Sequence, residues 1–173
     1  MDPNGKFYFI EANARIQVEH PITEMVSGLD LIREQIHVAF GDPLSIKQEE
    51  IRIEGHAIEC RVNAEDPETF SPSTGKIEKL HWPGGPGIRV DSHIRQGDKV
   101  TPFYDSLLGK IMAWGTNRDE SIQRMLCALD ECEVLGIKTN IPLHRQLLRH
   151  PDIVQGKLHV GLVEALLLEK VFG

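Results

Sequence analysis

Polar and apolar residues alternate strictly near the amino end of the chain. From Glu11 to Glu19 the order is Glu-Ala-Asn-Ala-Arg-Ile-Gln-Val-Glu. In an extended chain alternate side chains share one face, whereas a helix would scatter these five polar groups around its surface. The pattern therefore predicts an extended polar row, made of Glu11, Asn13, Arg15, Gln17 and Glu19. At ~3.3 Å per residue the row would span about 26 Å, so it either bends or serves two adjoining ligands.

The residues before the polar row predict half of a hairpin. Asn4-Gly5 stands ahead of an apolar stretch, which is a strong signal for a two-residue hairpin turn. We expect Lys6 to about Ala12 to form the second strand. The first strand would lie upstream of Met1, so we expect the chain to be the carboxyl-terminal part of a longer protein.

A helix and a linker are predicted after the polar row. Asp30 can cap a helix that Gly41 and Pro43 end. The apolar stripe of this helix contains Ile32, Ile36, Ala39 and Phe40. The polar residues 44–54 are expected to be an exposed linker. We place a domain boundary near Glu50, which divides the chain into residues 1–50 and 51–173.

The second half of the chain predicts short strands followed by helices. Strands are expected over residues 56–62, 75–81, 87–91 and 106–114, separated by Pro and Gly turns. Thr116 and Asp119 predict the start of a helix that Gly136 closes. The apolar stripe of this helix contains Ile122, Met125, Leu126 and Leu129. Further helices are expected after Pro142 and from about Gly161. This order predicts an α+β fold, a small antiparallel sheet with flanking helices.

Composition narrows the classes of function. The formal net charge is -7, and the basic residues are dispersed among acids, so we expect no nucleic-acid partner. No apolar run reaches the ~18 residues of a membrane span, and the amino end lacks a signal-peptide pattern, so we expect a cytoplasmic protein without a membrane partner. The three cysteines lack CxxC spacing, which argues against a zinc site and a disulfide framework.

Two strands carry candidate chemistry. The polar row offers carboxylates, a guanidinium and amides, which suit multi-point contact with anions and a metal ion. An ordinary half-exposed strand would also have a polar outer face, and both interpretations stay open. On the strand at residues 56–62, Glu59 and Arg61 alternate with apolar residues. Arg61 could pair with a carboxylate for structure or bind an anion.

Four blocks of sequence resemble one family. The run Phe-Ile-Glu-Ala-Asn-Ala-Arg-Ile-Gln-Val-Glu-His-Pro at residues 9–21 is similar to the signature of biotin carboxylases, the ATP-grasp component of biotin-dependent carboxylases. Residues 55–67, 104–110 and 136–140 resemble the same family in the same order. The resemblance covers nearly the whole chain. It implies the carboxyl-terminal domain of a biotin carboxylase at residues 51–173, preceded by the end of an ATP-grasp domain.

The resemblance implies a reaction and roles for particular residues. ATP, with Mg²⁺ or Mn²⁺, would activate bicarbonate as carboxyphosphate, and the carboxyl group would pass to biotin. Glu11 and Asn13 match metal-binding residues, and Glu19 matches the general base that takes the bicarbonate proton. Arg61 matches the arginine that stabilises the biotin enolate. The bicarbonate site would consist of Arg15, Gln17 and the backbone N–H of Val18.

Further implications concern the nucleotide, the partners and the pathway. Val160 falls near a residue that walls the adenine, and Pro86 and Arg89 fall in a region used for dimer contact. Expected partners are a biotin carboxyl carrier protein, a carboxyltransferase and a second copy of the full-length chain. The Pro-containing motifs at residues 20–21 and 63–67 resemble the acetyl-CoA carboxylase of fatty acid biosynthesis.

The sequence lacks several parts that such a site needs. We find no glycine-rich lid, no phosphate-binding lysines and no further metal carboxylate of the family's pattern, so we expect the chain alone to be inactive. Two alternatives remain. One is an ATP-grasp ligase of the carbamoyl-phosphate-synthesising type, and the other is a non-catalytic dimerisation or docking module.

Overall fold

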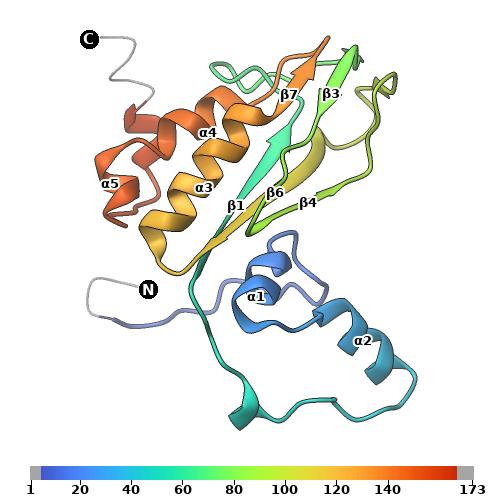
Figure 1. Cartoon of the computed structure of the whole chain (residues 1–173), viewed down its shortest axis with the longest axis vertical. Coiled ribbons are helices and arrows are strands. Elements are labelled where there is room, and N and C mark those ends of the chain that lie inside the picture. The colour runs from blue at the N-terminus through green and yellow to red at the C-terminus, as the bar shows by residue number, and fades with distance from the viewer. Residues whose placement is uncertain (1–4, 167–173) are drawn as a thin grey trace.

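Three antiparallel strands form the main sheet, in the order β1-β6-β4. The structure is a computed structural model that describes residues 5–166. The strands are β1 (His56–Asn63), β4 (Ile88–Ser92) and β6 (Leu107–Gly115) (Figure 1). In the registers, Cys60 and Val90 both lie opposite Ile111. Because side chains alternate across a strand, these apolar residues share one face of the sheet.

Helix α3 (Arg118–Glu131) covers this apolar face and closes the core. Its predicted stripe, Ile122, Met125, Leu126 and Leu129, is buried. The predicted start of this helix differs in its capping residue. Asn117 is the cap, since its side chain accepts a hydrogen bond from Glu120 N at 2.9 Å, and Glu120 in turn accepts from Thr116. The helix ends at Glu131, five residues before the predicted stop at Gly136.

Two short helices follow α3 along the same side of the sheet (Figure 1). They are α4 (Ile141–Leu147), predicted from Pro142, and α5 (Pro151–Val154), which was not predicted. Residues 162–166 are helical as well, in agreement with the helix expected from Gly161. Within residues 5–166 no helix combines the length and the apolar character that crossing a membrane requires.

Two additional two-stranded sheets correct the expectation of one sheet. The predicted strand at residues 75–81 is two strands, β2 (Gly75–Lys76) and β3 (Lys79–His81). Strand β2 pairs with β5 (Lys99–Val100), and β3 pairs with β7 (Glu133–Leu135). The chain changes partner between the two, because Ile77 N bonds to Asp98 O and Glu78 N bonds to Leu135 O. The residues of this segment alone do not indicate which two distant strands it pairs with, so the change of partner could not be predicted.

Two helices of the amino-terminal part, α1 (His20–Ser27) and α2 (Leu31–Ala39), lie away from α3, with α1 packed on β1 and β6 of the main sheet (Figure 1). Helix α1 was not predicted, although Pro21 in its first turn and Gly28 at its end are ordinary helix signals. Gly28 has φ 72°, and its N–H bonds to Glu24 O. A 3₁₀ turn, η1 (Gln48–Glu50), interrupts the predicted linker.

Helix α2 (Leu31–Ala39) confirms the helix predicted from Asp30. The Asp30 side chain accepts a hydrogen bond from Arg33 N at 2.9 Å, as a helix cap should. The apolar stripe, however, is not buried among the described residues, since Ile36 is 53% exposed and Phe40 is 85% exposed.

The strand expected from Lys6 to Ala12 is not formed. Residues 5–12 have no regular secondary structure, and the side chains of Phe7, Phe9 and Ile10 are exposed. A strand requires backbone pairing with a neighbouring strand, and none of the strands within residues 5–166 pairs with this run. Asn4, in the predicted turn, lies outside the described residues.

Candidate functional site

The face of the main sheet opposite α3 carries charged side chains. We define the polar face as Glu59, Arg61, Arg89, Asp91 and Lys110. Strand register explains the grouping, because Arg61 and Asp91 both lie directly opposite Lys110. Lys110 is only 9% exposed, so helix α1 and the residues before it bury charge on this side. A cluster of buried charges must be paired, and the pairing positions the amino-terminal part on the sheet.

Three polar contacts tie the amino-terminal part to the polar face. Arg61 Nη2 donates to Glu19 Oε2 at 2.9 Å. Lys110 Nζ donates to the carbonyl oxygen of Val18 at 2.8 Å. Arg89 Nη1 donates to Glu24 Oε2 at 2.6 Å. Each contact involves a different strand, so together they fix the end of the polar row and the start of α1 over the sheet.

The polar row forms no strand and bends, which is one of the two outcomes that its length predicted. Arg15 N bonds to Asn13 O at 2.9 Å, and His20 N bonds to Gln17 O at 3.3 Å, so the chain turns twice. The side chains nevertheless stay together. Arg15 Nη2 donates to Asn13 Oδ1 at 3.4 Å. All five members of the row line one cavity of about 430 Å³.

A second cavity, of about 750 Å³, lies on the other side of Arg61. Its lining includes Val18, Arg61, Asn63 and Tyr104. Glu19 lines the first cavity and Arg61 lines the second, and their ion pair links the two. The arrangement can hold two ligands, one on each side of a carboxylate and guanidinium pair.

Helix α4 fixes the backbone of Arg61. The carbonyl oxygen of Arg61 accepts hydrogen bonds from Asn140 Nδ2 at 3.0 Å and from the His144 ring at 2.8 Å. Asn140 Oδ1 also accepts from Asn63 N at 2.9 Å. Burial lowers the pKa of His144, although the bond to the Arg61 carbonyl opposes this effect. Because a carbonyl oxygen can only accept, the His144 ring nitrogen is the donor in this bond, and His144 acts as a structural donor behind Arg61.

The charges of the polar face shift one another's ionisation. Burial disfavours the charged form of Asp91, but hydrogen bonds and charge from Arg89, with Lys110 nearby, outweigh it and lower the pKa of Asp91. The pKa of Arg89 is raised, mainly by its bonds to Asp91. The pKa of Glu59 is raised, because burial outweighs the attraction of Lys110 and Arg61. Glu59 is thus the carboxylate of this face that is least well compensated.

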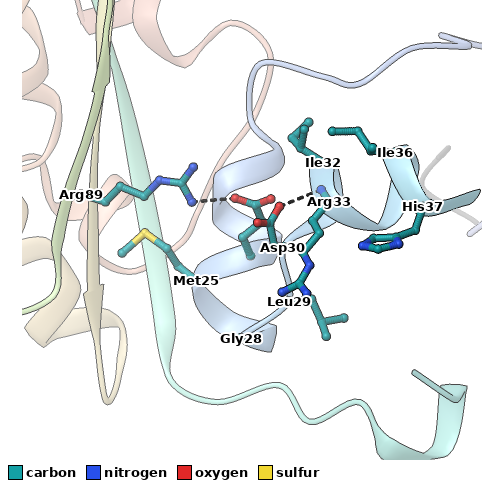
Figure 2. Close-up of a pocket in the computed structure, with 10 residues that line it drawn as sticks. Met25, Gly28, Leu29, Asp30, Ile32, Arg33, Ile36, His37 and Arg89 are labelled. Atoms are coloured by element: carbon teal, nitrogen blue, oxygen red, sulfur yellow. Dashed lines mark hydrogen bonds and ion pairs between the residues drawn. The ribbon is translucent and has the colours of Figure 1, made fainter. Parts of the chain in front are cut away.

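Figure 2 shows a third cavity, of about 710 Å³, between α1, α2 and β4. Arg89 reaches into it from β4 and meets the Glu24 carboxylate. Side chains of α2, among them Ile32 and Ile36, line the opposite wall. Pro86, which was expected near a dimer contact with Arg89, is exposed. A role of Pro86 and Arg89 in dimer contact stays a prediction.

The structure brings together most of the predicted site residues. Glu11, Asn13, Arg15, Gln17 and Glu19 share a cavity, and Glu19 meets Arg61. Val160 is fully exposed and is not among the residues that line the cavities of the polar row or of Arg61. Neither Lys110 nor Glu24 was expected in the site, and Glu59 was noted beside Arg61 on its strand without a role of its own. The sequence did contain a signal for Lys110, because a lysine within the otherwise apolar strand at residues 107–115 must have a polar partner.

The ends of two side chains in the first cavity suit a hard metal ion. Glu11 and Asn13 offer carboxylate and amide oxygens; here the Asn13 amide donates to Glu11 Oε1 at 3.5 Å and its oxygen accepts from Arg15, so Asn13 would have to rotate to place its oxygen beside the carboxylate. Mg²⁺ commonly takes one or two protein carboxylates and completes its shell with phosphate and water. No cluster of three or more His, Cys, Asp or Glu suited to a metal occurs among residues 5–166. The donor set therefore fits an ion that shares its shell with another ligand.

Sequence models of two protein families match the chain. The family described as Biotin carboxylase C-terminal domain matches residues 59–165, which is more than half of the chain. The family described as Carbamoyl-phosphate synthase L chain, ATP binding domain, matches residues 1–47. The placing of the domain boundary near Glu50 stays a prediction.

Individual proteins are similar over almost the whole chain. The chain is 53% identical to a biotin carboxylase of Pseudomonas aeruginosa over 161 residues, which are 93% of the chain and 36% of that relative. It is 51% identical to biotin carboxylase 1 of Bacillus subtilis, over 92% of the chain and 36% of that relative. The chain thus spans about a third of the length of the curated relatives that it matches.

A solved structure has the same fold. It is the biotin carboxylase domain dimer of 2-oxoglutarate carboxylase from Hydrogenobacter thermophilus, in complex with MgADP, ADP and bicarbonate. The TM-score is 0.92 at 45% identity, over 95% of the chain and 36% of the other chain. The expected α+β fold is therefore confirmed.

Proposed function

Since the chain belongs to the biotin carboxylase family, we propose that it carries the bicarbonate and biotin side of a biotin carboxylase site. The reaction is the ATP-dependent carboxylation of biotin by bicarbonate through carboxyphosphate. The observation that carries the proposal is the ion pair between Glu19 and Arg61, which stands between two cavities. A carboxyl transfer needs a base beside the anion and a cation beside its acceptor, and this pair provides both at adjoining positions.

Bicarbonate binds in the cavity of the polar row. The guanidinium of Arg15 grips the planar anion at two points, and Gln17 together with the N–H of Val18 donates further hydrogen bonds. The bond from Lys110 to the Val18 carbonyl fixes the peptide that carries this group. Glu19, in the same cavity, takes the proton of bicarbonate, which is effective because the two groups are held together.

Biotin enters from the cavity on the other side, where Arg61 is half exposed. When the ureido group of biotin loses its proton, the negative charge that develops on oxygen is stabilised by the guanidinium. Removing such a donor commonly lowers the rate by roughly 10²- to 10³-fold. The bonds from Asn140 and His144 to the Arg61 carbonyl keep the strand that carries this donor in place.

The nucleotide side of the site involves Glu11 and Asn13. Mg²⁺ or Mn²⁺ bound with ATP would supply charge neutralisation for phosphoryl transfer to bicarbonate. Glu11 and Asn13 would hold the ion, and their position in the same cavity as Arg15 puts it beside the anion. Val160 as part of the adenine wall belongs to the same proposal, supported by the family resemblance alone.

The test is a chimera in which this chain replaces the aligned 161 residues of the Pseudomonas aeruginosa biotin carboxylase. Bicarbonate-dependent ATP cleavage with free biotin is measured. We expect the chimera to be active, and Glu19→Gln or Arg61→Ala to lower the rate by roughly 10²-fold or more. Arg52→Ala, an exposed arginine of the linker that bonds only to the Glu49 carbonyl among the described residues, is the matched control.

Two results would contradict the proposal. A chimera that folds and binds nucleotide but does not cleave ATP would reject the catalytic role of these residues. An active chimera that tolerates both substitutions would reject the assignment of Glu19 and Arg61. A docking module without catalytic residues would then account for the chain better.

The partners follow from the same reaction. A biotin carboxyl carrier protein would deliver biotin to the cavity of Arg61, a carboxyltransferase would use the product, and two copies of the full-length protein would form a homodimer. The resemblance favours acetyl-CoA carboxylase and fatty acid biosynthesis, in the cytoplasm. Other relatives are subunits of pyruvate and 2-oxoglutarate carboxylases, so the final carboxyl acceptor differs within the family. Carboxylation assays with each acyl-CoA and 2-oxo acid would identify the acceptor of this protein.

A further inference from the structure

Glu59 is a buried carboxylate that the reaction proposed above does not use. It lies on β1 two residues before Arg61, so both side chains point to the polar face. The Glu59 side chain is only 6% exposed, whereas those of Arg61 and Glu19 are about half exposed at 49% and 51%. Neither Glu59 Oε1 nor Oε2 has a hydrogen-bond partner among residues 5–166.

Such a group is expensive for a folded protein. Buried polar atoms are nearly always hydrogen-bonded, and a buried carboxylate without a bonded partner loses its hydration with little return. An uncharged residue of the same size would avoid this cost. A buried carboxylate without a hydrogen-bond partner, two residues from the Arg61 that lines the second cavity, therefore indicates that its partner is present in another state of the protein.

Arg61 is the cation placed to become that partner. Arg61 Nε lies 3.9 Å from Glu59 Oε1, which is beyond hydrogen-bond range, while Arg61 Nη2 is bonded to Glu19 at 2.9 Å. The guanidinium thus lies between two carboxylates and is bonded to one. A small rotation of its end would exchange the bonded carboxylate without moving the backbone, which Asn140 and His144 hold.

The chemistry favours such an exchange. The guanidinium bonded to Glu19 Oε2 stabilises the ionised form of Glu19, so Glu19 becomes a stronger base for the proton of bicarbonate when the guanidinium moves away. Breaking the pair leaves Arg61 in need of a counter-charge close to the biotin cavity. The remaining titratable neighbours of Glu59 are Lys110, which is bonded to Val18, and His20 at the start of α1. Arg61 is the described cation whose side chain lies within 4 Å of Glu59, at 3.9 Å.

We propose that Glu59 is a positioning residue that receives the Arg61 guanidinium when Glu19 turns to its substrate. The proposal rests on the function proposed above, and it adds a second ion-pair partner for the guanidinium. In the closed state the Arg61 guanidinium is bonded to Glu19. In the catalytic state it is bonded to Glu59, so that the Glu19 base is free and the guanidinium still faces the biotin cavity.

The first experiment tests the exchange in the 173-residue chain itself, by a crystal structure of Glu19→Ala. Because Glu19 is half exposed, its removal leaves the core intact. We expect the distance from Arg61 Nε to Glu59 Oε1 to shorten from 3.9 Å to about 2.9 Å. A guanidinium that extends into solvent and leaves Glu59 without a partner would overturn the proposal, whether or not the chain has the proposed function.

The second experiment measures kinetics in the active chimera with Glu59→Gln. We expect kcat/KM for biotin to fall about 10- to 100-fold, as for a misplaced catalytic group, while KM for bicarbonate stays unchanged. The matched control is Glu120→Gln, a half-buried carboxylate of α3 on the opposite face of the sheet, which bonds to Thr116 and Arg124 and lines neither cavity. Its kcat/KM for biotin should stay at the value of the parent chimera.

Thermal denaturation separates positioning from a structural role. Because Gln removes an uncompensated buried charge, Glu59→Gln should unfold at the same temperature as the parent or higher. A lower melting temperature with equal losses for biotin and bicarbonate would show a structural role only. An inactive parent chimera would reject the proposed function, and the crystal structure of Glu19→Ala would still decide the exchange.

Discussion

Replacing Glu24 by Ala should destabilise the junction between the amino-terminal part and the sheet. The Glu24 carboxylate is 8% exposed and makes two charge-assisted bonds. One is to Arg89 on β4 at 2.6 Å, and the other is to the backbone N–H of Leu31 at the start of α2 at 2.8 Å. A single side chain of α1 therefore joins two other elements.

The magnitude follows from the burial of the two partners. A hydrogen bond to a charged group contributes ~1.5–3 kcal/mol. The bond to Arg89 counts for less, because its side chain is 37% exposed and keeps two bonds to Asp91 at 2.9 Å. We estimate a loss of about 2–4 kcal/mol for both bonds together. In a chain of this size each kcal/mol changes Tm by about 2–4 °C, so Tm should fall by about 5–15 °C.

The assay is thermal and urea unfolding of the chain, followed by circular dichroism. Glu133→Ala is the control, since its bond to Lys79 has the same length, 2.6 Å, but both side chains are well exposed at 37% and 58%. That variant should lose less than ~1 kcal/mol. Equal losses in the two variants would refute the argument that burial decides the strength of these ion pairs.

Four other outcomes are expected. Leu129→Ala, at a fully buried position of α3, should lower the free energy of unfolding by about 2–5 kcal/mol in urea titrations, whereas no effect would place α3 outside the core. Burial raises the pKa of Glu59, so the folded chain binds this proton more tightly than the unfolded chain, and the associated stability is lost as the pH rises above about 4.3. Glu59→Gln should therefore be stabilised more at pH 7 than at pH 4. Asp91 has a lowered pKa, so its contribution is lost as the pH falls below about 3.9, and Asp91→Asn should show the opposite dependence in the same unfolding series. Gly109→Ala should displace β4, because the added Cβ would stand 2.8 Å from Ser92 Cβ; an unchanged amide spectrum of β4 would contradict this.

Local patterns predicted the second half of the fold. The stripe of α3 and the alternation along β1 are properties of contiguous residues, and both elements form where expected. The elements that were predicted wrongly depend on contacts with residues that are distant in the sequence. The apolar run from Phe7 to Ile10 suits a strand, yet no neighbouring strand is described for it. Helix α1 was missed because it packs on a charged face, so its inner side includes Glu24 instead of a full apolar stripe.

For the candidate site, too, local patterns predicted some residues and the fold was needed to find the others. Periodicity grouped the five members of the polar row, and these side chains line one cavity although the backbone bends. Family resemblance pointed to Arg61, which is 42 residues from Glu19 in the chain and meets it in the fold. Lys110 was found only from the structure, and Glu59, which the sequence placed on the same strand face as Arg61, gained a role only there, because both roles depend on burial and on register between strands.

The bonds around the Arg61 carbonyl also bear on solubility. Strand β1 lies at the edge of the main sheet, and an open edge can pair with a strand of another molecule. Here the outward-facing carbonyl of Arg61 and the outward N–H of Asn63 are occupied by side chains of Asn140 and His144. A neighbouring molecule therefore cannot extend the sheet at this point. The same bonds that hold Arg61 protect the chain from edge-to-edge aggregation at the mouth of its own site.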